Sequence, residues 1–304
     1  MISTLRAGVI GAGVFGGYHA SKYADAADVD LTAVLDPHPE RAAGLVDRYG
    51  GRAVASLEEF LAAVDVVSIA TPAIHHGRLA LATLRAGKHV YVEKPIAVAL
   101  EEADAIVAEA RRQGLVAACG FLERAAFAAL GLYAIPHPPL RMECARLGPA
   151  SPRNLDVSVI VDLMIHDLDL ALHLTLAEPL TVEADGAGRD NHHLDEASAE
   201  VGFEDGFVAL FRASRVAETR ERTLTLAYAE GDVRLDLLAH RLENTTPWPL
   251  DAAFEESPGG RDRLGASLAA FLAAVRGDGA PLADAVDGAR ALDLALAVEH
   301  AVGG

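Results

Sequence analysis

Apolar and polar residues in the first 121 positions follow two alternating patterns. The strands predicted from short, mostly apolar runs are 5–10, 31–36, 64–71, 89–94 and 116–121. The helices predicted from the longer stretches between them are 16–26, 39–49, 56–63, 75–86 and 100–113. Strands that alternate with helices of this length indicate a parallel, doubly wound sheet with right-handed crossovers. We therefore predict an α/β domain over residues 1–120.

After residue 120 the chain changes to strands that follow one another directly. The strands predicted there are 141–148, 180–188, 197–204, 207–216, 221–230 and 232–239. Turn signals such as Glu204-Asp205-Gly206 separate them, which indicates a large, mostly antiparallel sheet. The helices predicted in this half are 157–174, 262–276 and 284–301. We predict a second, α+β domain over 121–304, with the last helix as a candidate to pack back on the first domain.

One face of the second sheet is expected to stay open. Residues 222–226 alternate polar and apolar side chains, so helices bury only one side of the strand. An open sheet face is a common dimerisation surface. We therefore predict a homodimer or homotetramer that forms through this face.

Composition and charge exclude several classes of protein. Hydrophobic residues make up 51% of the 304 positions, which is enough for a full core. The net charge of −18 disfavours nucleic acid and anionic membranes as partners, because both are bound through clustered Lys and Arg. The chain has neither a secretory signal pattern nor an apolar run long enough for a membrane helix, so we predict a cytoplasmic protein. Cys119 and Cys144 are expected to be reduced and structural.

A glycine fingerprint lies between the first predicted strand and helix. Gly11, Gly13 and Gly16 form G-x-G-x-x-G, and Asp36 ends the next predicted strand, twenty residues after Gly16. This order is typical of a dinucleotide site: the glycines allow a tight turn, close approach of the pyrophosphate and close helix packing. The phosphates then lie at the helix N-terminus, where unpaired N–H groups favour negative charge. The first domain is therefore predicted to be a Rossmann domain.

The preferred cofactor follows from the acid after the second strand. Asp36 can accept hydrogen bonds from both ribose hydroxyls and would repel a 2′-phosphate, which favours NAD. Arg41, five residues further on, leaves NADP as the alternative.

The predicted helix over 157–174 carries four titratable residues in an apolar run, namely Asp162, His166, Asp169 and His173. Asp162 and His166 lie one helical turn apart on the same face. Burying a carboxylate and an imidazole costs free energy unless they are paired or functional. The pair is either a proton-transfer site or an ordinary hydrogen-bonded pair in a buried helix. Asp169 and His173 are interpreted as a packing pair.

Metal binding is a less favoured alternative role for these four residues. The four side chains could line one stripe of the helix, and His192, His193 and Asp195 form a second cluster. Neither group has a known zinc-ligand spacing, and hydride transfer to nicotinamide needs no metal. We predict no metal site.

Three motifs in this order resemble the Gfo/Idh/MocA family of NAD(P)-dependent sugar and polyol oxidoreductases. They are the glycine fingerprint, Glu93-Lys94-Pro95, and Asp162-x-x-x-His166. The stretch 70–95 resembles the segment of the family that leads to the Glu-Lys-Pro motif. The likeness extends over essentially the whole chain. It implies a Rossmann domain followed by an α/β domain with a large open sheet.

The resemblance also implies site residues. The catalytic set is Lys94, Asp162 and His166. The cofactor contacts are Gly11, Gly13, Val14, Phe15, Gly16, Asp36, Arg41, Thr71, Pro72, His76, Glu93 and Lys94. The substrate contacts are Lys94, Arg124, Arg153, Asn154 and His166. Two positions depart from the family pattern: Ala73 replaces a frequent Asn, and Arg124-Ala125-Ala126 replaces an Arg-Phe-x-Pro-like stretch.

A narrower resemblance, at 123–127 and 153–172, is to the family branch that includes UDP-N-acetylglucosamine 3-dehydrogenases. It implies oxidation at C3 of the sugar to a 3-keto sugar nucleotide, which a partner aminotransferase uses. Arg124, Arg146 and Arg153 are the candidates to contact a diphosphate, and each is equally readable as a surface arginine.

The proposed reaction moves a hydride to nicotinamide and the hydroxyl proton to a base. His166 is the candidate base, Asp162 would fix its tautomer, and Lys94 would donate to the developing alkoxide. The roles of Lys94 and His166 could be exchanged. The alternatives are an inositol or free-sugar dehydrogenase of the same family and, in another class, a non-catalytic NAD- or sugar-sensing regulator. Retention of the three catalytic residues favours an enzyme.

Overall fold

The computed structural model describes residues 4–150, 156–188 and 193–303. The chain divides into two compact units, which are described separately. The first consists of residues 1–122 and 264–289, and the second of 123–263 and 290–304. The sequence predicts the domain boundary at residue 120 and assigns all of 121–304 to the second domain. In the structure, residues 264–289 belong to the first unit. The last helix, α10 (Ala285–Gly303), therefore has residues in both units.

The first unit is built on a six-stranded sheet in the order β3-β2-β1-β4-β5-β6, in which every pair is parallel. Its strands are β1 (Leu5–Ile10), β2 (Val29–Leu35), β3 (Arg52–Ala53), β4 (Val66–Ile69), β5 (His89–Val92) and β6 (Ala117–Cys119). The order reverses between β1 and β4. In such a sheet ligands bind at this switch point, beyond the carboxyl ends of the strands. The predicted doubly wound sheet is thus confirmed.

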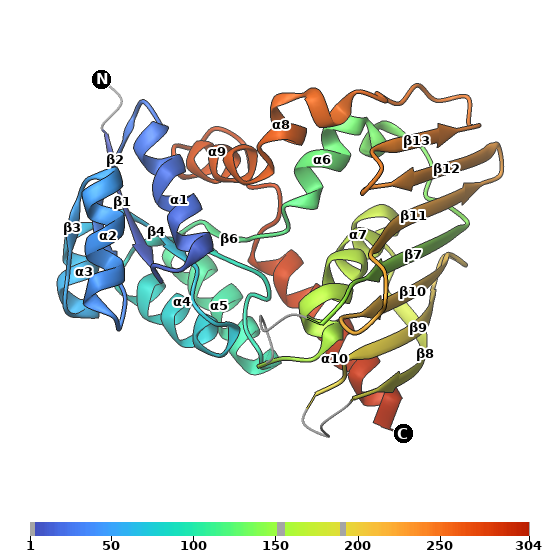
Figure 1. Cartoon of the computed structure of the whole chain (residues 1–304), viewed down its shortest axis with the longest axis horizontal. Helices are drawn as coiled ribbons and strands as arrows, with labels where there is room; N and C mark the ends of the chain where they lie inside the picture. The colour runs from blue at the N-terminus through green and yellow to red at the C-terminus, as the bar shows by residue number, and fades with distance from the viewer. Residues whose placement is uncertain (1–3, 151–155, 189–192, 304) are drawn as a thin grey trace. The chain divides into compact units, whose positions relative to one another are not determined.

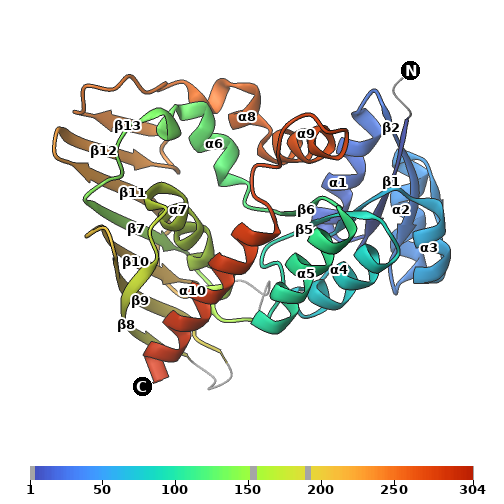
Figure 2. The same ribbon diagram turned by 180° about the vertical axis from the view of Figure 1, so that it is seen from behind.

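Helices cover both faces of the first sheet (Figures 1 and 2). They are α1 (Val14–Asp25), α2 (Pro39–Tyr49), α3 (Leu57–Ala63), the short turn η1 (Ala73–His75), α4 (His76–Arg85), α5 (Leu100–Gln113) and α9 (Arg263–Val275). One core cluster joins α1, α2 and α9 to the strands, with Tyr23, Tyr91 and Phe271 fully buried in it. Aromatic rings of this size bury large apolar areas, so they dominate the packing of this face.

The second unit is built on a seven-stranded sheet in the order β13-β12-β11-β7-β10-β9-β8. Its strands are β7 (Arg141–Leu147), β8 (Pro179–Ala187), β9 (Glu196–Phe203), β10 (Val208–Ser214), β11 (Glu221–Tyr228), β12 (Gly231–Asp236) and β13 (Arg241–Asn244). The mostly antiparallel sheet is confirmed, but it is not a simple meander. β7 separates β10 from β11 and runs parallel to β10.

Helical segments of the second unit lie on one face of its sheet (Figure 1). They are α6 (Glu123–Leu130), η2 (Leu132–Ala134), the π-helical turn η3 (Ile160–Met164), α7 (Ile165–Thr175), η4 (Phe254–Glu256), α8 (Pro258–Arg261) and the later part of α10. The helix expected over 157–174 thus begins with a π turn. The other face carries a hollow of about 440 Å³ lined largely by polar side chains such as Glu143, Glu183 and Glu200. None of the helices in the described ranges has the length and apolar character needed to cross a bilayer.

Candidate active site

The glycine fingerprint forms the turn between β1 and α1. Gly11 has φ +98°, and a Cβ there would lie 2.5 Å from the carbonyl oxygen of Ala70. A Cβ on Gly16 would lie 1.8 Å from the carbonyl oxygen of Gly11. By contrast, a Cβ on Gly13 would have no atom within 4 Å. Gly11 and Gly16 are therefore required by the turn itself, whereas Gly13 leaves open space next to the backbone.

The N-terminus of α1 is available to an anion. Gly13 is its N-cap residue and supplies no capping side chain. The first N–H groups of a helix have no partner within the helix, and their dipoles favour negative charge. Val14 and Phe15, the first two residues of α1, are 55% and 45% exposed. Apolar side chains so exposed beside the turn are suited to contact a bound ligand.

Asp36 directly follows β2 and is 9% exposed. One carboxylate oxygen accepts from the Ala12 N–H at 2.7 Å, and the other accepts from the His38 N–H at 2.8 Å. A carboxylate has about four acceptor positions, so these two bonds leave capacity for ribose hydroxyls. Asp36 thus ties the glycine turn to β2. Arg41 lies exposed on α2.

His76, expected to contact the cofactor, is buried and connects two loops. Its Nδ1 lies 2.7 Å from the carbonyl oxygen of Pro95, and its Nε2 lies 2.8 Å from that of Thr71. Burial lowers the pKa of His76, and the two carbonyl contacts oppose this shift because only the imidazolium donates from both nitrogens. His76 therefore joins the Thr71-Pro72 loop to the turn that holds Lys94. Pro72 is exposed, and Lys94 is half-buried.

A buried polar chain connects Glu93 to α1. Nε2 of His19 lies 2.8 Å from Oε1 of Glu93, and Nδ1 lies 2.9 Å from the hydroxyl of Ser68. The Ser68 hydroxyl is also 2.7 Å from the Tyr23 hydroxyl. His19, Ser68 and Tyr23 have no exposed surface, and burial raises the pKa of Tyr23. Glu93 is thus held inside the unit, next to the half-buried Lys94. The sequence did not predict this series of buried hydrogen bonds. The single His19 in the predicted first helix was the available signal.

In the second unit, His166 meets a carboxylate that the sequence did not predict. Its Nδ1 lies 2.8 Å from Oε2 of Glu123, the first residue of α6. Burial opposes ionisation of Glu123, but attraction to His166 and Arg146 outweighs it, so the pKa of Glu123 lies well below its usual value. Glu123 and His166 are 43 positions apart, so no local spacing in the sequence connects them.

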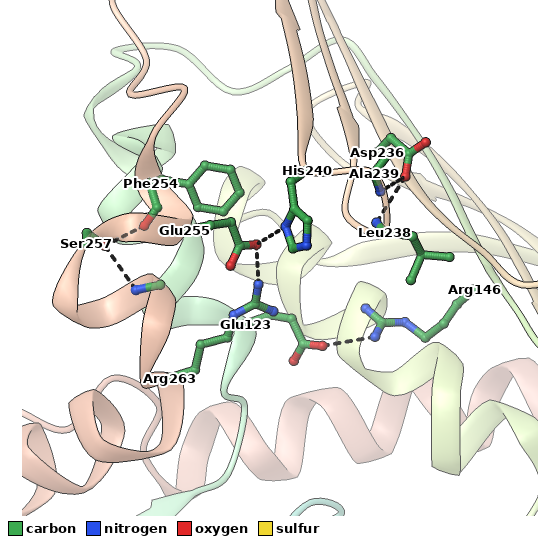
Figure 3. A network of polar contacts seen from close by, with 11 residues as sticks. Glu123, Arg146, Asp236, Leu238, Ala239, His240, Phe254, Glu255, Ser257 and Arg263 are labelled. Atoms are coloured by element: carbon green, nitrogen blue, oxygen red, sulfur yellow. Dashed lines mark hydrogen bonds and ion pairs between the residues drawn. The ribbon is translucent and has the colours of Figure 1, made fainter.

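Arg146 extends this cluster on the covered face of the sheet. Its guanidinium donates to Glu123 at 3.0 Å and to both carboxylate oxygens of Asp167 at 3.1 and 2.7 Å. Figure 3 shows Arg146 and Glu123 meeting, with Arg263, Glu255 and His240 drawn in the same view. Arg146 is 4% exposed, so its three hydrogen bonds offset the cost of burying the charge. Asp162 is also buried, in the π turn before His166.

The remaining predicted residues lie elsewhere in the second unit. Arg124, expected to contact substrate, is 4% exposed and donates to both carboxylate oxygens of Asp169 at 2.9 and 2.6 Å. The ring of His173 packs edge-on against Tyr133 at 4.6 Å. Arg153, Asn154 and His192 lie outside the described residues.

The described histidines and carboxylates considered as metal ligands make other contacts or are not grouped. Asp195 accepts from Arg215 at 2.8 Å, which leaves it in an ion pair. In the described ranges, no group of three or more His, Cys, Asp or Glu side chains is arranged to hold a metal ion. Cys119 and Cys144 are both buried, and burial raises the pKa of Cys144.

Together, these features fit a nicotinamide dinucleotide in the first unit. The pyrophosphate fits the open backbone at Gly13 and the uncapped start of α1. The ribose fits the carboxylate of Asp36. The fold and site therefore define a dinucleotide-binding enzyme of the α/β class.

Comparison with known proteins identifies the family. Residues 5–121 match the model of an oxidoreductase family with an NAD-binding Rossmann fold, and 145–234 match the GFO/IDH/MocA C-terminal domain. The chain is 38% identical, over 98% of its length and 97% of the relative, to UDP-N-acetylglucosamine 3-dehydrogenase from Acidithiobacillus ferrooxidans. The chain therefore belongs to the GFO/IDH/MocA family of oxidoreductases, and its cofactor is NAD.

Solved structures agree with this fold. A structure of the Acidithiobacillus ferrooxidans enzyme has a TM-score of 0.89, with 99% of this chain and 98% of that chain covered, at 38% identity. The WlbA dehydrogenase from Bordetella pertussis, crystallised with NADH and UDP-GlcNAcA, has a TM-score of 0.87 at 19% identity, with 100% and 96% covered. At that identity the second comparison shows likeness of fold alone. The resemblance drawn from the three motifs is confirmed.

Proposed function

We propose that this protein oxidises a secondary alcohol of a sugar nucleotide, with UDP-N-acetylglucosamine as substrate and C3 as the reacting carbon. The observation that carries the proposal is the 38% identity over 98% of the chain to an enzyme named for that reaction. Similarity that extends over both units covers the substrate-binding half as well as the dinucleotide-binding half. The alcohol loses a hydride from its carbon and a proton from its oxygen.

The first unit would hold NAD through the backbone at Gly13, the start of α1 and the Asp36 carboxylate. NAD supplies the hydride acceptor. We propose that Lys94 donates a hydrogen bond to the alcohol oxygen, which stabilises that oxygen as its negative charge develops. Thr71, Pro72, Val14 and Phe15 are proposed cofactor contacts.

In the second unit, we propose His166 as the base that takes the hydroxyl proton. Glu123, 2.8 Å from its Nδ1, would stabilise the imidazolium that forms. The expected role of Asp162 in orienting His166 stays a prediction, and so do the substrate contacts of Arg124, Arg153 and Asn154. The same applies to the choice between Lys94 and His166 as the base.

An inositol or free-sugar dehydrogenase is the second candidate. The chain is 26% identical, over 78% of its length and 75% of the relative, to scyllo-inositol 2-dehydrogenase (NAD(+)) from Bacillus subtilis. A neutral polyol needs no cationic contacts in the second unit, whereas a sugar diphosphate does. The two candidates therefore differ in charge as well as in ring structure.

A substrate panel tests the proposal. UDP-N-acetylglucosamine, N-acetylglucosamine and inositol are each supplied with NAD or NADP, and the reduced cofactor is measured by absorbance. We expect turnover of the UDP-sugar with NAD and a lower Michaelis constant for NAD than for NADP. Turnover of inositol alone would support the second candidate. Cofactor binding without turnover of any substrate would support a sensor.

Two substitutions test the residue roles. Lys94→Ala and His166→Asn are each expected to reduce kcat at least 100-fold, the usual contribution of a positioned acid, base or donor. NAD affinity should change little. Full activity in both variants would overturn the assignment of these residues.

A cytoplasmic location and self-association through the open face of the second sheet stay predictions. Light scattering of the purified protein measures the second: a mass of two or four chains agrees with it, and a single chain does not.

A further inference from the structure

Three arginines interact electrostatically near Glu123, on the covered face of the second sheet. Arg146 donates to Glu123 and Asp167, and Arg263 donates to Glu255 at 2.5 Å. The third, Arg222 on β11, makes no hydrogen bond or ion pair to a carboxylate among the described residues. Arg222 is therefore the member of this group whose charge is not compensated by a direct partner.

The position of Arg222 follows from the sheet register. Arg222 is the Cα partner of Arg146 in the antiparallel pair of β11 and β7. Arg222 lies on the same face of β11 as Leu224 and Leu226, which are 2% and 0% exposed. Its side chain therefore projects from the covered face of the sheet. Directly opposed residues have Cβ atoms about 5 Å apart. Arg222 therefore enters the same space as the Arg146–Glu123–His166 chain of contacts.

This placement is unfavourable for Arg222 in the protein alone. Like charges directly opposite one another in a sheet are destabilising. Burial lowers the pKa of Arg222, and the charge of Arg146 lowers it further, against the attraction of Glu123 and Asp167. A half-buried cation with these neighbours gains most from a mobile anion that supplies the missing hydrogen bonds.

The choice of cations in the second unit is narrow. All three lysines of the chain, Lys22, Lys88 and Lys94, precede residue 123. The other described arginines of this unit either pair with carboxylates, as Arg124 and Arg215 do, or are exposed. Among the described residues of this unit, the permanently charged cations that could meet an anionic substrate group beside His166 are therefore arginines.

We propose that Arg222 is a substrate-binding residue, which binds an anionic oxygen group carried by the sugar substrate next to the His166–Glu123 pair. The proposal rests on the proposed function and deepens it by naming the charge of the substrate. A phosphoryl group and a carboxylate share the required chemistry, because both accept paired hydrogen bonds from a planar guanidinium. Arg222 would then favour charged sugars over neutral polyols.

The experiment compares Arg222→Gln and Arg222→Lys with Arg212→Gln. Arg212 lies exposed on β10 and serves as the matched control. For UDP-N-acetylglucosamine, Arg222→Gln should raise KM about 10- to 100-fold, which corresponds to the loss of one or two charged hydrogen bonds. The loss of kcat/KM on N-acetylglucosamine should be much smaller. Arg222→Lys should retain part of the affinity, and Arg212→Gln nearly all of it. Equal losses on the charged and the neutral sugar would overturn the proposal.

A binding measurement separates this proposal from the proposed function. Calorimetry with NAD present in excess measures UDP, pyrophosphate and glucuronate binding to the intact protein. Weaker binding of these anions to Arg222→Gln than to wild type and Arg212→Gln would support the subsite even if the reaction at C3 is wrong. Comparison of UDP and pyrophosphate with glucuronate shows whether Arg222 prefers a phosphoryl group or a carboxylate. Unchanged anion binding in Arg222→Gln would overturn the proposal whatever the substrate is. The melting temperature controls for folding, and removal of one of two opposed arginines should not lower it.

Discussion

Nδ1 of His166 lies 2.8 Å from Oε2 of Glu123, a residue 43 positions earlier in the chain. The other carboxylate oxygen of Glu123 accepts from Arg146 at 3.0 Å. A carboxylate that Arg146 holds in place orients the imidazole that it contacts, and it stabilises the charged form of that imidazole. The second unit thus holds His166 through residues of α6 and β7, in addition to any contribution of Asp162 from the π turn before α7.

Glu123→Gln should change activity in a pH-dependent way. The amide keeps the size of the side chain but removes the charge that stabilises the His166 imidazolium. We expect kcat to fall about 10- to 100-fold, the usual cost of losing a supporting carboxylate. The acidic limb of kcat/KM should move to lower pH by about one unit, because a nearby carboxylate raises the pKa of a base by about that amount or more.

The measurement is a pH profile of kcat/KM for wild type, Glu123→Gln and Glu143→Gln. Glu143 lies exposed on the open face of β7 and provides the control. A Glu123→Gln profile that coincides with wild type would show that Glu123 does not act on the group that titrates.

The same residue should make stability depend on pH. The pKa of Glu123 in the folded protein lies well below its ordinary value of 4.5. Its ionised form therefore stabilises the fold fully above about pH 4.5, and this contribution is lost as the pH falls through the folded-state pKa. The difference in free energy of unfolding between wild type and Glu123→Gln should therefore shrink as the pH falls below about 4.5.

Urea unfolding at several pH values on each side of 4.5 measures this difference. Glu218→Gln, which removes an exposed carboxylate, controls for the loss of one charge. A difference between wild type and Glu123→Gln that stays constant from neutral to acidic pH would contradict the expectation.

Two glycine substitutions should separate folding from cofactor binding. Gly16→Ala places a Cβ 1.8 Å from the Gly11 carbonyl oxygen, so the turn must open and stability should fall by several kcal/mol, about 3 or more. Gly13→Ala meets no atom within 4 Å and should fold normally. Its methyl group would occupy the space that the pyrophosphate backbone contact requires, so NAD affinity should fall at least about tenfold.

Melting temperature and NAD binding are measured for both variants and for Gly44→Ala. Gly44 lies within α2, also with no atom within 4 Å of an added Cβ, and its substitution should leave NAD affinity unchanged. Normal NAD binding by Gly13→Ala would contradict the assignment of this turn to the pyrophosphate.

The first unit was predictable because its signals are local. Apart from the two-residue strand β3, which the sequence did not predict, each strand is a short, mostly apolar run. Helices lie between these runs, and the glycine turn stands between β1 and α1. β1 ends where expected, but the other predicted strands of this unit end one or two residues early: β4 covers Val66–Ile69 rather than 64–71, because the loop toward Thr71 leaves the sheet. The dinucleotide site was predicted for the same reason, since its residues follow one another along the chain.

The second unit was predicted less completely because its decisive contacts join distant segments. Alternation identified most strands, but it carries no information on which strands pair, so the central place of β7 between β10 and β11 was missed. The four-residue strand β13 and the helix α6 were also missed. Arg146 gave a usable signal, because an arginine inside a buried strand requires carboxylate partners, but its sequence position does not say which ones.

The buried pair of His19 and Glu93 should couple the start of the chain to the segment that carries Lys94. The His19 side chain is fully buried, and that of Glu93 is 11% exposed. His19→Leu would leave the Glu93 carboxylate buried without this partner, and we expect a loss of about 3 kcal/mol in the free energy of unfolding. Glu93→Gln should cost less, because an amide still bonds to the imidazole. In the double variant the two losses should be less than additive, since both remove the same contact.

Urea unfolding of the two single variants and the double variant measures the coupling. Ser21→Ala, a milder change on the same helix, is the control. Additive losses would mean that His19 stabilises α1 through Ser68 alone and does not hold Glu93.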